Sequence, residues 1–394
     1  MMKKRTGNKV AASIAAAAMM LGTSGISAMA YDYEDKYLWY LPTESFTWDN
    51  YDALWRHHKM MGYGKETFDI ESLIDSELGE SLVKNMEYFL KGYDEMDPEV
   101  VKHWKNMGIK KELHDSDDES RVWSSYTPLE VFDPENADKK YPVLFVYHGN
   151  NNPLFICESY GFAQLAAKDG YICVMPWADN GAIADTETDR ILEILKEKYP
   201  IDESRIYAAG FSLGGRTVVS EAIRTPDRFA AINVGGQHLA GVKDIEDFYT
   251  DEQWAALKDL PVIQMAGMEE MNLKFPYGVQ GEIQIDAVNK WFEINGIKNE
   301  VSLEECEEIV NTSDSIVEQK LGLEFDEESV QYYDGTQYYT GDFFNEDGIN
   351  MMRMVGIEDL IHWPSGSFAQ VAWDFMSQYA RDTETGELIV LEAE

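Results

Sequence analysis

The chain has 394 residues, and its 33 Lys and Arg against 72 Asp and Glu give a formal net charge of −39 at pH 7. Phosphate backbones are bound through clustered Lys and Arg, so a surface this acidic excludes nucleic acid as a partner and repels anionic lipid headgroups. A hydrophobic share of 44% excludes disorder as the overall state and predicts one large globular domain or two.

Residues 1–30 have the pattern of a secretory signal peptide. A basic start ending at Lys9 precedes an apolar run from Val10 to Leu21, and Ala28-Met29-Ala30 supplies the small residues that a signal peptidase recognises. The apolar run is short for a membrane span, so we expect cleavage and no stable membrane insertion. The mature protein is therefore predicted to be secreted or otherwise extracytoplasmic.

Residues 31–120 are predicted to form a helical amino-terminal extension rich in Trp, Tyr and acidic residues. Apolar side chains recur at helical spacing from Ser81 to Leu90, and Pro98 begins another predicted helix that ends at Met107. No catalytic motif occurs in this extension. The acidic run Asp115 to Glu119 lacks the Gly and the distal Glu of a calcium-binding EF-hand loop, which favours a solvated linker.

Residues 121–394 are predicted to form the catalytic domain, in which short apolar runs alternate with helical stretches. The runs are 143–147, 171–175, 205–209, 230–234, 261–265 and 351–355, and helical spacing marks Ile191 to Leu195 and Phe368 to Tyr379. This alternation predicts an α/β fold with a doubly wound, mostly parallel sheet covered by helices on both faces. The segment Val122 to Phe132 is a candidate antiparallel edge strand.

An insertion is predicted at about residues 271–349, before the last strand, because one crossover helix needs far fewer residues. It contains a helical pattern from Ile285 to Phe292, a second that begins at Ser302 with Glu305 as a possible capping box, and a hairpin-like aromatic stretch from Val330 to Phe344. The sequence leaves two interpretations open. The insertion is a lid or wall of the substrate cleft, or it is a stabilising excursion over the sheet.

The strongest chemical signal is Gly210-Phe211-Ser212-Leu213-Gly214-Gly215, between the strand at 205–209 and a predicted helix. A serine hydroxyl is a weak nucleophile unless it is held clear of the sheet and a base takes its proton. A sharp strand-to-helix turn exposes the hydroxyl, and glycines at 210 and 214 remove side chains that would collide with the neighbouring strand and helix. Ser212 is therefore the predicted nucleophile.

The predicted base is His362. In folds with such an elbow the partners follow in the order serine, acid, histidine, which leaves His238 and His362. His238 comes directly after the next strand, so no further strand intervenes to carry an acid before it. His362 follows the last strand, where a loop reaches the edge of the sheet at which ligands bind.

The predicted acid follows the strand at 261–265, where the loop reads Gly267-Met268-Glu269-Glu270. A carboxylate here would orient the histidine and stabilise its imidazolium form. Glu270, at the third position after the glycine, is our first choice, and Glu269 is the alternative.

Two backbone N–H groups are expected to bind the oxyanion. The N–H of Leu213 lies at the head of the helix after the elbow, where the helix dipole assists it. The second donor should come from the loop after the strand at 143–147, which reads His148-Gly149-Asn150. Glycine allows close approach to the substrate, so we expect the Asn150 N–H to donate. His148 is expected to hold this loop rather than to act as a base.

His148-Gly149, the elbow at 210–215 and His362-Trp363-Pro364, in this order, make residues 121–380 resemble the α/β-hydrolase superfamily. More narrowly, the region looks like the branch of polyhydroxybutyrate depolymerase-like, feruloyl and acetyl xylan esterases. The resemblance implies hydrolysis of a small or polymeric ester through an acyl-enzyme, with no cofactor and no metal. This sequence departs from the usual pattern in offering Glu rather than Asp as the acid.

Two other functions remain open from the sequence. A serine peptidase can use the same elbow, although the propeller that usually accompanies such enzymes would need a repeat that this sequence lacks. A catalytically idle binding module of the same fold would not need all three chemical roles. A secreted serine esterase, acting on acyl or feruloyl groups of plant polysaccharide or on a polyester, is the function that the motifs favour.

Overall fold

The computed structural model describes residues 104–115, 122–149, 157, 160–176, 187–241, 249–268, 270, 275, 281–333, 336–358, 360 and 367–392, without the side chains of 115 and 122. The predicted signal peptide and the extension up to residue 103 lie outside these ranges. Within the ranges, no helix combines the length and the apolar character needed to cross a bilayer.

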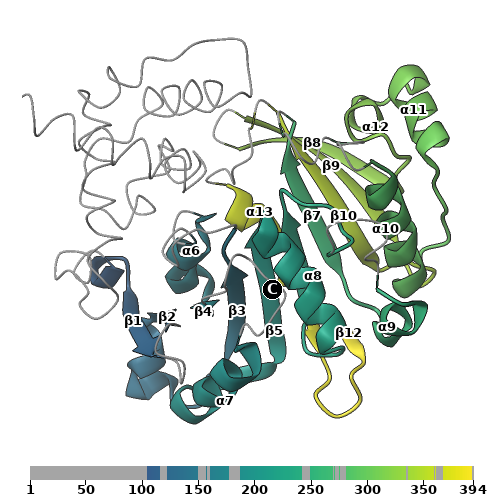
Figure 1. Cartoon of the computed structure of the whole chain (residues 1–394). Coiled ribbons are helices and arrows are strands. Elements are labelled where there is room, and N and C mark those ends of the chain that lie inside the picture. Colours follow the sequence, from purple (N-terminus) through teal and green to yellow (C-terminus); the bar gives the residue numbers. More distant parts are fainter. Residues whose placement is uncertain are drawn as a thin grey trace, which may run out of the picture.

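A ten-stranded mixed sheet forms the centre of the protein, in the order β1-β2-β4-β3-β5-β6-β7-β10-β9-β8 (Figure 1). Its six middle strands run parallel to one another. They are β4 (Ile172–Pro176), β3 (Tyr141–Tyr147), β5 (Ile201–Phe211), β6 (Ala231–Gly235), β7 (Val262–Gly267) and β10 (Asn350–Ile357). Each coincides with one of the six predicted apolar runs to within one residue at the start of the run or contains it, so the doubly wound, mostly parallel sheet is confirmed.

Helices cover both faces of the sheet, which is why the middle strands are apolar on both sides. One core cluster joins the sheet to α6 and α13, and a second joins it to helices on the opposite face. Every residue of β3, β4, β6 and β7 is buried. The helices are α6 (Phe162–Asp169), α7 (Thr188–Lys198), α8 (Leu213–Arg224), α9 (Asp251–Ala256), α10 (Gly281–Ile294), α11 (Leu303–Thr312), α12 (Ile316–Leu321) and α13 (Phe368–Met376).

The first edge of the sheet differs from the prediction. The candidate edge strand is β2 (Val122–Pro128), which is antiparallel as expected, but β1 (Ile109–Asp115) pairs outside it. The predicted boundary at residue 120 therefore falls between two strands of one sheet. β1 reads IKKELHD and contains no apolar run. It is the end strand of the sheet, and its backbone pairing with β2 is what makes this segment a strand. Two short 3-10 helices, Leu129–Phe132 and Pro134–Asn136, follow β2.

The insertion contributes helices and two further strands. The predicted capping box is present at α11, where Ser302 Oγ accepts from the Glu305 N–H at 3.3 Å and Glu305 Oε2 accepts from the Ser302 N–H at 2.9 Å. The predicted hairpin is also present, as β8 (Glu327–Tyr333) and β9 (Thr336–Phe344). It extends the sheet beyond β10 in its own plane instead of lying over it, and α12 packs on one face there (Figure 1).

The chain ends in a small second sheet of β11 (Tyr379–Arg381) and β12 (Leu388–Val390). The predicted final helix reached Tyr379, whereas α13 ends at Met376. Arg381 anchors the small sheet, since its buried guanidinium donates to the carbonyl oxygens of Phe229 at 3.0 Å, Gly386 at 2.7 Å and Asp259 at 3.0 Å.

Candidate active site

The parallel strands end together at one edge of the sheet. Tyr147 of β3 pairs with Gly210 of β5, and Phe211 at the end of β5 pairs with Gly235 of β6. Further along the edge, Gly267 of β7 pairs with Ile357 of β10. The loops that carry the predicted site residues all begin at these positions. Because adjacent strands lie about 4.8 Å apart, loops that begin in register start close together, as ligand sites in open α/β sheets require.

Ser212 occupies the elbow between β5 and α8 in a strained backbone conformation. Its φ is 58° and its ψ is −125°, a region that residues other than glycine seldom adopt. Such a conformation costs about 1 to 3 kcal/mol and persists only where the surroundings enforce it. Here the Ser212 N–H donates to the Gly235 carbonyl at 2.8 Å, and the Ser212 carbonyl accepts from the Gly215 N–H at 2.9 Å.

Two glycines of the motif make this turn sterically possible. A Cβ added at Gly210 would stand 2.3 Å from the Gly214 carbonyl oxygen. One added at Gly214 would stand 2.0 Å from the carbonyl oxygen of Tyr147, at the end of β3. Neither gap holds a methyl group, so the close approach of α8 to β3 and β5 requires both glycines. The spacing expected from the sequence therefore has the predicted steric reason.

Leu213 is the first residue of α8, where a helix supplies no acceptor for the backbone N–H. Its N–H is at the position expected of an oxyanion donor. The second predicted donor, Asn150, lies outside the described residues. The loop leading to it is described as far as Gly149, whose N–H donates to the Tyr160 hydroxyl at 3.3 Å. His148 is buried, and its Nδ1 donates to the Gly149 carbonyl at 2.8 Å, because a carbonyl oxygen can only accept.

Glu270 lies just beyond β7 with only 3% of its surface exposed. Its N–H donates to the Gly267 carbonyl at 3.3 Å, which makes a turn at the end of the strand. Glu269 and His362 lie outside the described residues, and the convergence of the three triad side chains stays a prediction. What it does place side by side are the ends of β7 and β10, from which Glu270 and His362 follow in the chain.

His238, which was not the predicted base, is hydrogen-bonded within its own loop. His238 is buried in the loop after β6, and its Nδ1 accepts from the Ala240 N–H at 3.3 Å. This hydrogen bond fixes Nδ1 as the unprotonated nitrogen and holds the loop. A histidine tied to its own loop in this way fits a structural role.

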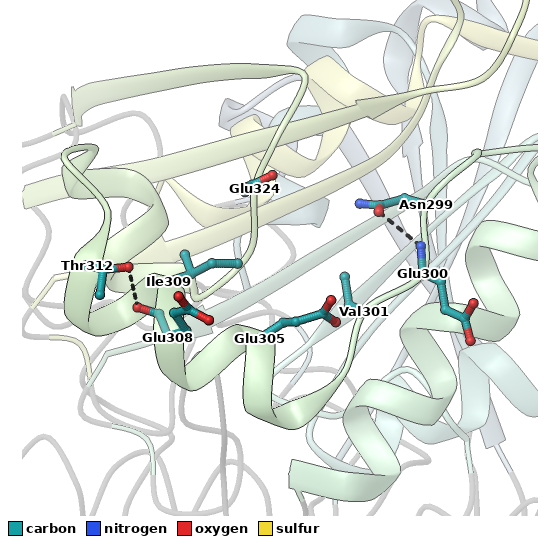
Figure 2. A pocket seen from close by; sticks show the side chains of 8 residues that line it. All are labelled: Asn299, Glu300, Val301, Glu305, Glu308, Ile309, Thr312 and Glu324. Carbon is teal, nitrogen blue, oxygen red and sulfur yellow. Dashed lines mark hydrogen bonds between the residues drawn. The ribbon is translucent and has the colours of Figure 1, made fainter.

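A pocket of 330 Å³ lies beside α11 and is lined by Glu300, Glu305, Glu308 and Glu324 among others (Figure 2). None of the predicted catalytic residues lines it. Asn295, just after α10 and four residues before the pocket residue Asn299, donates its side-chain N–H to the carbonyl of Met351, near the start of β10. The pocket therefore lies towards the starts of the parallel strands, whereas the elbow lies at their ends. Among the described residues, no group of His, Cys, Asp and Glu is arranged to hold a metal ion.

Residues that no motif singled out pack at the carboxyl edge of the parallel strands. Lys320 of α12 forms an ion pair with Glu358, the first residue after β10, at 2.9 Å. Met268, which precedes the two candidate acids, packs against Gly356 of β10. No local pattern in the sequence would have found these residues, because their partners come from distant segments.

Comparison with known proteins gives one curated relative and a set of distant structures. No family model matches the chain. A bifunctional acetylxylan esterase/xylanase from Neocallimastix patriciarum is 27% identical over 112 residues, which make up 26% of this chain. The chain spans 17% of that relative's length.

Solved structures that resemble the chain include an acetyl xylan esterase from Aspergillus awamori, at 13% identity and a TM-score of 0.40, covering 64% of this chain and 94% of that one. An S-formylglutathione hydrolase from Agrobacterium tumefaciens has 14% identity and a TM-score of 0.36, covering 46% and 83%. The strands and the elbow of this chain themselves define its fold.

The observed order of the strands and the position of the elbow identify the fold. Six parallel strands lie between antiparallel edge strands, with helices on both faces. The strained serine stands at the carboxyl end of a middle strand, at the head of the helix that follows. These are the features that define a nucleophile elbow on an α/β-hydrolase sheet. The chain therefore has an α/β-hydrolase fold.

Proposed function

We propose that the protein is a serine esterase that hydrolyses neutral carboxylic esters through an acyl-enzyme. The observation that carries this proposal is the strained backbone of Ser212, at φ 58°, enforced by the glycines at 210 and 214. Strain of this kind is retained where it serves a function, and here it presents a hydroxyl at the ligand-binding edge of the sheet.

In the proposed mechanism, Ser212 Oγ attacks the ester carbonyl while the His362 imidazole takes its proton. The Leu213 and Asn150 N–H groups stabilise the oxyanion, each being worth about 3 kcal/mol in the transition state. His362 then protonates the departing alcohol, which leaves the acyl group on Ser212. A water molecule, deprotonated by His362, attacks the acyl-enzyme, and the proton returns to Ser212 as the acid is released. Glu270 orients the histidine, with Glu269 as the alternative.

For the substrate we propose acetyl or feruloyl groups on plant polysaccharide, with a polyester as the further possibility. The similarity to a bifunctional acetylxylan esterase/xylanase supports the acetylated polysaccharide. The net charge of −39 favours neutral over anionic substrates. The predicted signal peptide at 1–30 supports export to the space in which such polymers are found.

The test of the mechanism is Ser212→Ala, assayed with p-nitrophenyl acetate and with a fluorophosphonate that labels activated serines. We expect kcat to fall by about 10⁶-fold and labelling to disappear, because the nucleophile is lost. Turnover equal to that of the wild type would refute the assignment. His362→Ala should be similarly inactive, and wild-type activity should decline at low pH as the base becomes protonated.

The acid and the substrate need separate experiments. The kcat values of Glu270→Gln and Glu269→Gln are compared with each other. The variant that lacks the true acid is expected to have a kcat about 10⁴-fold lower than that of the wild type. A larger loss in Glu269→Gln would transfer the role to Glu269. A panel of acetyl, feruloyl and hydroxyalkanoate esters with one amide identifies the substrate class, and preferential cleavage of the amide would show a peptidase instead.

A further inference from the structure

The insertion touches the loops on which the proposed triad depends. α12 lies on the face of the sheet beside β9 and β10, and its last two residues are Lys320 and Leu321. Lys320 contacts Glu358 at the start of the loop after β10. Leu321 lies beside Gly356 of β10, where Met268, at the start of the loop after β7, also lies. These are the loops that lead to His362 and to Glu270 in the chain.

The contact with the loop after β7 is apolar and depends on a glycine. A Cβ at Gly356 of β10 would stand 2.7 Å from Met268 Sδ and 2.8 Å from Leu321 Cδ2. Gly356 has no positive φ, so the position requires an absent side chain rather than an unusual backbone. Met268 and Leu321 of α12 therefore both pack over Gly356 of β10, and Met268 lies two residues before Glu270.

The contact with the loop after β10 is polar. Lys320 Nζ lies 2.9 Å and 3.0 Å from the two carboxylate oxygens of Glu358, and it lies over the ring of Tyr339 at 5.3 Å. The Glu358 N–H donates to the Gln337 carbonyl of β9 at 2.9 Å. The insertion thus holds both the side chain and the backbone of the residue with which the loop begins.

The two loops are also joined directly, since the Met268 N–H donates to the Ile357 carbonyl at 2.8 Å. A shift of α12 would therefore be transmitted to both loops at once. Lys320 and Glu358 are each about one-third exposed, at 30% and 29%. Ion pairs with such access to solvent contribute little to the stability of a fold.

We propose that Lys320 and Leu321 of α12 are positioning residues of the esterase. They fix the positions of the two loops that follow β7 and β10 and carry the proposed acid and base. This inference rests on the proposed function. In this proposal α12 of the insertion contributes to catalysis by keeping the two loops in place. Catalytic groups have to be held closely, because a misplacement of about 1 Å can cost about 10²-fold in rate.

The first test is Lys320→Met, with kcat, KM and the midpoint of thermal unfolding measured together. We expect kcat to fall by about tenfold or more while KM and the unfolding midpoint stay near those of the wild type. Lys320→Arg should retain most of kcat. The exchange of charges in Lys320→Glu/Glu358→Lys should recover activity relative to either single variant.

The matched control is Lys290→Met. Lys290 forms an ion pair with Asp251 at 2.8 Å and is exposed to a similar degree, 32% against 30%, but it joins α10 to α9 and not to Glu358. It should leave kcat unchanged. An equal loss in both variants, or a wild-type kcat in Lys320→Met, would overturn the positioning role.

The second test is Gly356→Ala, which adds a methyl group close to both Met268 and Leu321. If Met268 shifts the proposed acid, the carboxylate stabilises the imidazolium less, so the acid limb of the kcat/KM profile moves to lower pH. A folded variant with the wild-type rate and profile contradicts the inference. A wild type that neither cleaves any ester nor reacts with the fluorophosphonate refutes the proposed function itself, and the inference with it.

Discussion

Replacing Ser212 by glycine should make the protein more stable than replacing it by alanine, although both variants are inactive. Both substitutions remove the hydroxyl, but alanine keeps the Cβ that makes φ 58° and ψ −125° unfavourable. Relief of that strain is worth about 1 to 3 kcal/mol. Glycine gives back about 0.4 to 1 kcal/mol through the greater freedom of the unfolded chain. The glycine variant should therefore be the more stable by about 1 kcal/mol.

The assay is urea unfolding of the two variants, supported by thermal unfolding, in which a difference of about 1 kcal/mol appears as about 1 to 2 °C for a chain of this length. Ser377 provides the control, because its φ of −66° and ψ of −8° suit any residue. There the order should reverse, with alanine more stable than glycine by about 0.5 to 1 kcal/mol. Equal stability of the two Ser212 variants, or the same order at both positions, would refute the strain argument.

Three further predictions concern the fold. Gly214→Ala should lose about 1 to 3 kcal/mol in urea unfolding, since its Cβ would stand 2.0 Å from a carbonyl oxygen of β3; full stability would contradict the clearance argument. Burial lowers the pKa of His114 from 6.5 to about 4, so stability present above pH 6.5 should be lost as the pH falls towards 4, by about 2 kcal/mol after allowance for partial exposure. His114→Gln should lose less stability than the wild type over that range, and an identical loss would exclude this histidine as the cause. Arg381→Met leaves buried carbonyl oxygens without their donor and should cost about 3 kcal/mol, against no more than about 1 for Lys290→Met.

The parallel sheet was predictable because its strands are covered on both faces. Complete burial demands continuous apolar runs, such as 143–147 and 261–265, and these are visible without any knowledge of the partner strands. The elbow was predictable for a related reason. The residue types that it requires fall within six consecutive positions, 210–215, so the glycines and the serine appear together in the sequence, although the carbonyl oxygen that excludes a side chain at Gly214 belongs to Tyr147 of β3.

The strand β1 could not be predicted from its own residues. Its residues, Ile109–Asp115, alternate too weakly between apolar and polar for any strand pattern, and they form a strand because β2 offers a row of hydrogen-bonding partners. The plane of the β8 and β9 hairpin is a similar case. The sequence predicted the hairpin, but its pairing with β10, which adds it to the sheet, depends on an edge formed by residues far away in the chain.

The sequence by itself determined the candidates for the proposed chemistry, since the serine elbow, the candidate acids at 269 and 270 and the histidine at 362 are local features of type and order. Only the tertiary structure decided how the supports of these loops are built. Lys320 reaches Glu358, and Met268 fills the space beside Gly356, through contacts between segments that are dozens of residues apart. Contacts of this kind leave no local signature, because each depends on the packing of the whole sheet.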